Sequence, residues 1–369
     1  MDDFLIIGGG VIGLSLAYQL AGDGHRVRVI DRTEPGHEAS WAGAGILPPA
    51  NRSSSSDPLD QLTTLSHRLH AQWTRDLKES TGIDNGYRRC GALYIARSQA
   101  EQELLKAAAE IWRSQQVACE ELNNAGLAEV EPALAAEHAG VLAAWRLPDE
   151  CQLRNPRHLK ALVAACSLRG VEIVSAAEAE FFVRQGSRVT HVKTPAGDFS
   201  AGNFCIATGA WTGKLGERVG LRMAVKPIRG QIALVNAGRP VLRQILNEGP
   251  RYLVPRPDGY VLIGSTEEDV GFDKRTTTAA TSGLLQFALG LVPELGAAPL
   301  ERSWSGLRPC TKDGLPYLGR APDFDNLYVA AGHFRGGLHL SPATAVVLSQ
   351  LMLGQTPEVD LTAFAVNRN

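Results

Sequence analysis

The start of the chain carries the sequence pattern that most restricts its fold. A short apolar run at 4–7 leads into the glycine cluster GGGVIG at 8–13, and a helical segment follows at 14–20. Residues 26–30 are typical of a second strand, which ends at Asp31, 23 positions after Gly8. A buried strand, G-x-G-x-x-G, a helix and a second strand ending in an acidic residue together predict a dinucleotide-binding α/β unit.

Each part of this pattern has a physical role. We expect Gly8 to form the tight turn, Gly10 to let the backbone approach a pyrophosphate, and Gly13 to let the helix pack closely on the strand. The pyrophosphate would lie at the positive end of the helix, and Asp31 would accept hydrogen bonds from the ribose hydroxyls. The alternative is a glycine-rich turn in an ordinary βα unit, and the pattern alone does not distinguish NAD from FAD.

Composition limits the remaining classes of function. The 37 basic and 39 acidic residues give a net charge of −2, which argues against a protein that binds a nucleic-acid backbone. The six cysteines lack the spacing of a zinc site or a disulfide framework, so we expect a reducing cytoplasm. Residues 4–21 are uncharged, but their glycine pattern explains this better than a membrane span does, and Asp2 and Asp3 stand where a signal peptide carries positive charge.

The order of the other patterns predicts two domains within the 369 residues. Apolar strands at 203–207 and 326–330 each meet glycine at their carboxyl ends, where ligands bind in open α/β sheets. Residues 225–263 alternate with period two, and the turn signal at 256–259 predicts a hairpin. We therefore predict a mixed α/β protein, with a Rossmann-like domain in three pieces of chain and an inserted antiparallel-sheet domain.

Two arginines stand in unusual surroundings. Arg308 lies close to glycine and proline, which predicts a rigid turn, and Arg335 lies on the glycine-rich loop 332–337. A guanidinium can bind a carboxylate through two hydrogen bonds, and a surface ion pair is the alternative for either residue. Ser341 and Pro342 predict the start of the last helix, whose positive end either faces a bound flavin or only packs beneath the sheet.

Seven segments spread over nearly the whole chain carry a family resemblance. They are GGGVIGLS at 8–15, EASWAGAGIL at 38–47, ATGAW at 207–211, YLVPRPDG at 252–259, IGSTEED at 263–269, GLRPCTKDGLPYLGR at 306–320 and AAGHFRGGLHLSPAT at 330–344. With them the chain resembles the glycine oxidases of thiazole biosynthesis, in the superfamily of D-amino-acid and sarcosine oxidases. The resemblance implies an FAD-binding domain at 1–85, 148–222 and 306–369, and a substrate-binding domain at 86–147 and 223–305.

The resemblance also implies an activity. FAD, bound non-covalently, would accept a hydride from glycine, with sarcosine and small D-amino acids as further candidates, and glyoxylate, ammonia and hydrogen peroxide would be formed from the substrate and dioxygen. No metal is required. We expect a homo-oligomer with a small amino acid as substrate and no nucleic-acid partner. The alternatives are a D-amino-acid or sarcosine oxidase, a quinone-linked D-amino-acid dehydrogenase, and a non-catalytic flavoprotein module.

The resemblance assigns residues to the site. Arg308 should bind the substrate carboxylate, with Arg335 and the Tyr252 hydroxyl nearby. The expected FAD-binding residues lie in the fingerprint, in the loops after it, near the adenine, and before the last helix. They are Gly8, Gly10, Val11, Ile12, Gly13, Asp31, Arg32, Ala39, Ser40, Ala44, Gly45, Ile46, Ala179, Gly209, His333, Phe334, Arg335, Gly336, Gly337, Leu338 and His339.

Three positions leave alternatives open. His339 stands where an apolar residue is common in the family. Glu267 lies in a variable part of the pocket wall, where it either faces the substrate amine or is the solvated end of a hairpin. Cys310 lies in the region where some sarcosine oxidases tether their flavin, but the Tyr-Thr that follows in those enzymes is missing here, so a structural cysteine is expected.

Overall fold

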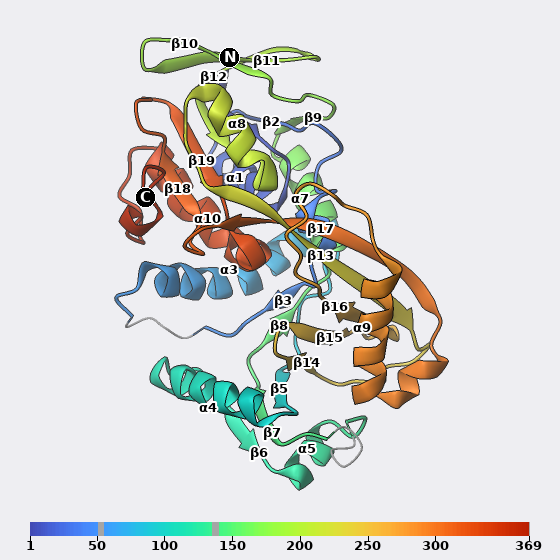
Figure 1. The fold of residues 1–369 in the computed structure, drawn as a ribbon. Helices are drawn as coiled ribbons and strands as arrows, with labels where there is room; N and C mark the ends of the chain where they lie inside the picture. The colour runs from blue at the N-terminus through green and yellow to red at the C-terminus, as the bar shows by residue number, and fades with distance from the viewer. Residues whose placement is uncertain (51–54, 135–139, 369) are drawn as a thin grey trace.

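The strands of the protein form two large sheets in a computed structural model that describes residues 1–50, 55–134 and 140–368 (Figure 1). The parallel core of the first sheet is built from three separate parts of the chain. Its strands, in spatial order, are β9 (Glu172–Val174), β2 (Val27–Ile30), β1 (Asp2–Ile7), β12 (Gly197–Ile206) and β19 (Leu327–Ala331). The antiparallel strands β10 (Phe181–Gln185), β11 (Arg188–Thr194) and β18 (Tyr317–Arg320) extend this sheet.

Both faces of the first sheet are covered, which explains why residues 4–7 of β1 are continuously apolar. Phe4 and Ile6 point into a core formed with four helices on one face. Leu5 and Ile7 point into a second core, shared with the β10–β12 meander and with α8 (Thr212–Val219) on the other face. The four helices are α1 (Val11–Gly22), α3 (Pro58–Thr81), α7 (Asn155–Leu168) and α10 (Gly337–Met352).

The second sheet alternates its side chains between two environments. Leu253 and Ile263 pack under α9 (Thr278–Leu291), whereas Tyr252 and Val254 point to the opposite face. The strands, in order, are β17 (Leu300–Thr311), β13 (Val225–Asn236), β16 (Tyr260–Gly264), β15 (Arg251–Pro255), β14 (Ile245–Glu248), β5 (Ala92–Ala96), β7 (Ala143–Leu147) and β6 (Glu120–Leu122). The sheet is antiparallel except for the pair β14–β5, which is parallel.

Smaller elements complete the two halves. The β10–β11 hairpin lies at one end of the molecule and α4 (Gln99–Ser114) and α5 (Asn124–Val130) lie at the other (Figure 1). Strands β3 (Ile46–Leu47), β8 (Cys151–Gln152) and β4 (Arg88–Arg89) form a small sheet, and α2 (Ala39–Ala42) precedes it. β17 runs without interruption across residues 305–306, where the sequence predicts a domain boundary.

The last helix begins four residues earlier than the sequence predicts. Ser341 and Pro342 lie inside α10, which starts at Gly337, so their interpretation as N-cap and first helical residue is wrong. Pro342 cannot donate to the Leu338 carbonyl, which instead accepts from the Ser341 hydroxyl (2.9 Å) and lies 3.1 Å from His70 Nε2.

Helix α3 also supplies hydrogen-bond partners to the next backbone pair of α10, His339 and Ala343. The Ser66 hydroxyl donates to the His339 carbonyl and accepts from the Ala343 amide (3.2 Å), so it stands between two groups that would bond directly in a regular helix. Tertiary contacts therefore allow a proline inside a helix whose local sequence predicts a later start.

Candidate active site

The fingerprint forms the turn that the sequence predicts. Gly8 has φ +110°, in the region that favours glycine, and α1 starts three residues later at Val11. A Cβ on Gly13 would lie 2.0 Å from the Gly8 carbonyl oxygen, so only glycine permits this contact between turn and helix. Asp31, directly after β2, holds the turn, since its Oδ2 accepts a hydrogen bond from the Gly9 amide (2.7 Å).

A cavity of about 510 Å³ lies between the two sheets, at the carboxyl ends of β1, β2, β12 and β19. All the residues predicted from the sequence to contact FAD or substrate line it, with one exception. The exception is Gly13, which packs against the turn as described. His339 lines the cavity, whereas Glu267 and Cys310 are not among the described residues that do.

The groups around the cavity fit a dinucleotide. Helices α1 and α10 both start at its wall, and their N-caps, Gly10 and Gly336, make no side-chain capping hydrogen bond. In the first turn of α1 the Val11 amide donates to the Ser40 hydroxyl (2.9 Å), and the positive ends of both helix dipoles favour anionic groups of a ligand at this wall. Next to Asp31, the Arg32 guanidinium stacks 3.6 Å above the Trp211 ring, and both residues line the cavity.

The second sheet forms the opposite wall. The strand register places Ile232, Gly264, Tyr252, Asn247 and Tyr94 in one row across five strands. Directly paired residues point to the same face of a sheet, and all of these except Gly264 line the cavity. Sequence reasoning found Tyr252 but missed Asn247 and Tyr94. The pairing of β14 with β15 places Asn247 beside Tyr252, and the pairing of β14 with β5 adds Tyr94.

Arg308 lies within β17, and the prediction that it stands on a rigid turn is wrong. Pro309 faces Pro227 of β13, a position where an antiparallel ladder can leave both backbone amides unpaired, so the strand tolerates the prolines. The guanidinium donates to the Ser265 hydroxyl (2.7 Å) and to the Thr266 carbonyl (3.1 Å). Burial lowers the pKa of Arg308. The ordinary pKa of an arginine is so high that the side chain is still a cation at neutral pH.

Gly230 makes the space that Arg308 occupies. A Cβ at this position would lie 2.3 Å from three atoms of the guanidinium. Gly230 is directly paired with Gly306, where a Cβ would lie 2.6 Å from the Ala42 Cβ, so the two glycines make room for Arg308 and for α2. The site is therefore shaped by small residues on β13 and β17 as well as by the arginine itself.

Arg335 lies at the exposed edge of the cavity. Its guanidinium forms an ion pair with Glu267 (3.2 Å) and donates to the Pro250 carbonyl (3.2 Å). The side chains of Arg335 and Glu267 are 38% and 47% exposed, so solvent weakens this pair. The exposure of Glu267 favours the alternative that it is the solvated end of a hairpin over the alternative that it faces the substrate amine.

Glu150, in the loop between β7 and β8, is a buried acid next to the cavity wall. It is completely buried, and its Oε2 accepts a hydrogen bond from the Tyr94 hydroxyl (2.8 Å). Burial raises the pKa of Glu150 to about 7, although Tyr94 and Asn247 act in the opposite direction. The carboxyl group is therefore a candidate for changing its charge near neutral pH.

We expect Glu150 to make stability depend on pH. Between about pH 4.5 and 7 the folded protein keeps a proton that the unfolded protein has lost, so the free energy of unfolding should fall as pH rises through this window. Over the whole window, the titration of Glu150 lowers the free energy of unfolding by about 3 kcal/mol. Urea unfolding at about pH 5 and about pH 8 measures it. The dependence should shrink in Glu150→Gln and persist in a control, Glu110→Gln, at an exposed position of α4. Equal dependence in both variants would contradict the assignment.

Within residues 1–50, 55–134 and 140–368, no group of three or more His, Cys, Asp or Glu side chains could hold a metal ion. None of the helices in these same ranges combines the length and apolar character needed to cross a membrane.

Comparisons with known proteins agree with the geometry of the site. Residues 3–351 match the family described as FAD dependent oxidoreductase. A glycine oxidase of Geobacillus kaustophilus (strain HTA426) is 36% identical over 368 residues, covering 100% of this chain and 97% of that protein. The crystal structure of glycine oxidase from Geobacillus kaustophilus covers 100% of this chain and 99% of its own, with a TM-score of 0.94 and 34% identity. The bifunctional protein ThiO/ThiG of Trichormus variabilis is 33% identical over 99% of this chain, which spans 55% of that protein.

Proposed function

Since the chain belongs to the family of FAD dependent oxidoreductases, we propose that it oxidises glycine with FAD and dioxygen to glyoxylate, ammonia and hydrogen peroxide. The observation that carries this proposal is the Arg308 guanidinium in the cavity wall formed by the second sheet. A half-buried cation in a ligand cavity is suited to bind the carboxylate of an amino acid, and a protein that only holds a flavin has no use for it.

Each chain residue then has a role. Arg308 binds the substrate carboxylate and fixes its orientation, and the Tyr252 hydroxyl supports the same group. Arg335 adds positive charge at the edge of the cavity. The amides at the starts of α1 and α10, together with Asp31, hold the cofactor. Bound FAD supplies the two-electron oxidation of the amine carbon and is reoxidised by dioxygen.

Several finer points belong to the same proposal. We assign FAD binding to residues 1–85, 148–222 and 306–369, and substrate binding to 86–147 and 223–305. The enzyme would act in the cytoplasm, in line with its six free thiols, and as a homo-oligomer. A role in making the thiazole of thiamine is supported by the similarity to glycine oxidases and to ThiO/ThiG.

Anaerobic reduction of the flavin tests the proposal. We expect glycine to bleach the visible absorbance of the purified holoenzyme without oxygen, and hydrogen peroxide to form when oxygen is admitted. A panel with sarcosine and D-alanine gives the order of preference. Bleaching without peroxide would indicate a quinone-linked dehydrogenase, and no bleaching by any small amino acid would show that the protein is a non-catalytic flavoprotein.

A further inference from the structure

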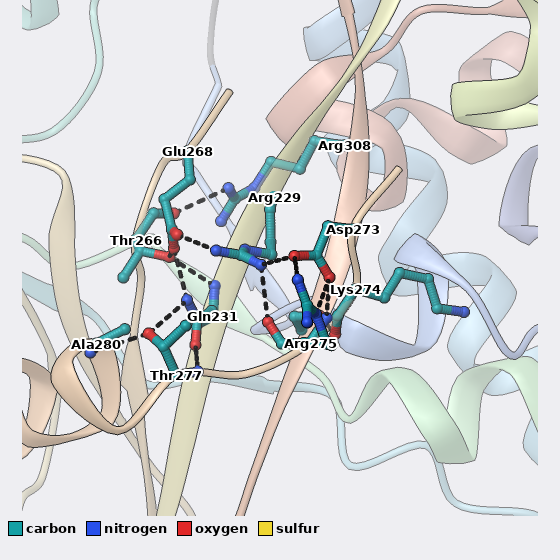
Figure 2. A network of polar contacts seen from close by, with 11 residues as sticks. Arg229, Gln231, Thr266, Glu268, Asp273, Lys274, Arg275, Thr277, Ala280 and Arg308 are labelled. Atoms are coloured by element: carbon teal, nitrogen blue, oxygen red, sulfur yellow. Dashed lines mark hydrogen bonds and ion pairs between the residues drawn. The ribbon is translucent and has the colours of Figure 1, made fainter. Parts of the chain in front are cut away.

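A network of polar side chains contacts Arg308 through the loop that follows β16 (Figure 2). Its centre is Arg229 of β13, which is 4% exposed. Its guanidinium pairs with Glu268 and with Asp273 (3.3 Å) and donates to the Arg275 carbonyl (2.9 Å). Arg229 and Glu268 also exchange two backbone hydrogen bonds, of 2.9 and 3.0 Å. Arg229 therefore fastens the loop between β16 and α9 onto the sheet.

Glu268 carries this attachment on to Thr266. Its Oε2 pairs with Arg229, and its Oε1 accepts hydrogen bonds from the Thr266 hydroxyl and from Gln231 Nε2 (2.7 Å). The Thr266 hydroxyl in turn accepts from the Gln231 amide (2.9 Å). Both carboxylate oxygens are thus engaged, which offsets the cost of holding the charge next to the sheet.

Thr266 and its neighbour complete the connection to the site. The Thr266 carbonyl accepts from Arg308 Nη1 (3.1 Å), and the Ser265 hydroxyl accepts from Nη2 (2.7 Å). Both terminal nitrogens of the guanidinium are therefore held by this loop. The contacts run without a break from Arg229 through Glu268 and Thr266 to Arg308.

We propose that Glu268, locked in place by Arg229, is a positioning residue that orients Arg308 for the substrate carboxylate. This inference rests on the proposed function of Arg308 as the carboxylate-binding group. Glu268 touches neither cofactor nor substrate in this scheme; it acts through Thr266. A residue that orients a binding side chain affects ligand affinity, because a small displacement of that side chain weakens a contact made through two hydrogen bonds. A residue elsewhere in the protein that contributes equally to folding stability has less effect on affinity.

Acetate binding to the FAD-loaded enzyme tests this role. Acetate is a carboxylate without an amine, and its binding can be followed as a change in the flavin absorbance. Glu268→Ala should raise the acetate Kd and the glycine KM about tenfold while kcat changes less than about threefold. Glu268→Gln should have a smaller effect, because its amide oxygen can still accept from Thr266 and Gln231.

Asp273→Asn is the matched control. Asp273 also pairs with Arg229, but its carboxylate makes no contact with Thr266 among the described residues. Its acetate Kd should stay within about twofold of the unaltered enzyme, as expected for a group that supports only the loop. A lower unfolding temperature in the Glu268 variants, with acetate Kd unchanged, would overturn the proposal and leave Glu268 a purely structural group.

A second pair of variants keeps the test decisive if Glu268→Ala does not fold. Thr266→Val removes the hydroxyl that Glu268 binds and keeps the carbonyl that holds Arg308. Combined with Glu268→Gln, it should raise the acetate Kd no more than Thr266→Val alone does, since any effect of Glu268→Gln on Arg308 passes through the Thr266 hydroxyl. Additive effects would overturn the proposal. An unaltered enzyme that bound neither acetate nor glycine would instead overturn the function proposed above, and the role of Glu268 with it.

Discussion

Replacing Arg308 by alanine should abolish carboxylate recognition and leave FAD bound. The guanidinium is a half-buried cation of the cavity wall, and the loss of such a partner costs about 3–4 kcal/mol. This corresponds to a rise of about 10²–10³ in the glycine KM. Steady-state kinetics give KM, and the visible spectrum of the purified variant reports the FAD content.

Arg308→Lys separates charge from geometry in the same experiment. Lysine keeps a positive charge but cannot make two parallel hydrogen bonds or donate to both Ser265 and Thr266 in the same way. We expect it to recover only part of the affinity. If Arg308→Ala still saturated at the glycine concentration of the unaltered enzyme, another group would bind the carboxylate.

Gly230→Ala should damage the site almost as strongly without adding or removing any charge. The new methyl group would lie 2.3 Å from the guanidinium of Arg308, and a flexible side chain yields to it more easily than the paired strands do. A displacement of about 1 Å at a substrate-orienting group can reduce kcat/KM about a hundredfold. We expect a loss of this size, with little change in the free energy of unfolding.

Gly283→Ala provides the matched control for this substitution. Gly283 lies inside α9, and a Cβ there would meet no atom within 4 Å. Alanine in a helix interior should stabilise the protein by up to about 1 kcal/mol and leave kinetics unchanged. A Gly230→Ala enzyme with normal kcat/KM would show that the carboxylate site does not depend on the present position of Arg308.

The sequence predicts best those parts of the fold that local contacts determine. The first strand, the glycine turn and the first helix are adjacent along the chain, so spacing alone indicates their arrangement around Gly8 and Gly13. The hairpin at 256–259 is local in the same sense, and it joins β15 to β16 as predicted.

Long-range pairing explains what sequence reasoning missed. Arg308 was predicted on a turn, but β13 pairs along the whole length of β17 and keeps the segment extended despite Pro309. Asn247 and Tyr94 become neighbours only because β14 lies parallel to β5, strands that are far apart in the chain. The start of α10 was misplaced for a similar reason, since its proline is compensated from α3.

The interrupted hydrogen bonding of α10 has a consequence for the order in which the enzyme matures. Ser66 and His70 supply partners to α10 across 268 to 273 positions of sequence. The first turn of this helix, which lines the cofactor cavity, therefore cannot be completed before α10 has docked on α3. Contacts of such separation form late because their loop-closure entropy must first be overcome. We infer that FAD is captured at the end of folding and does not serve as an early template for it.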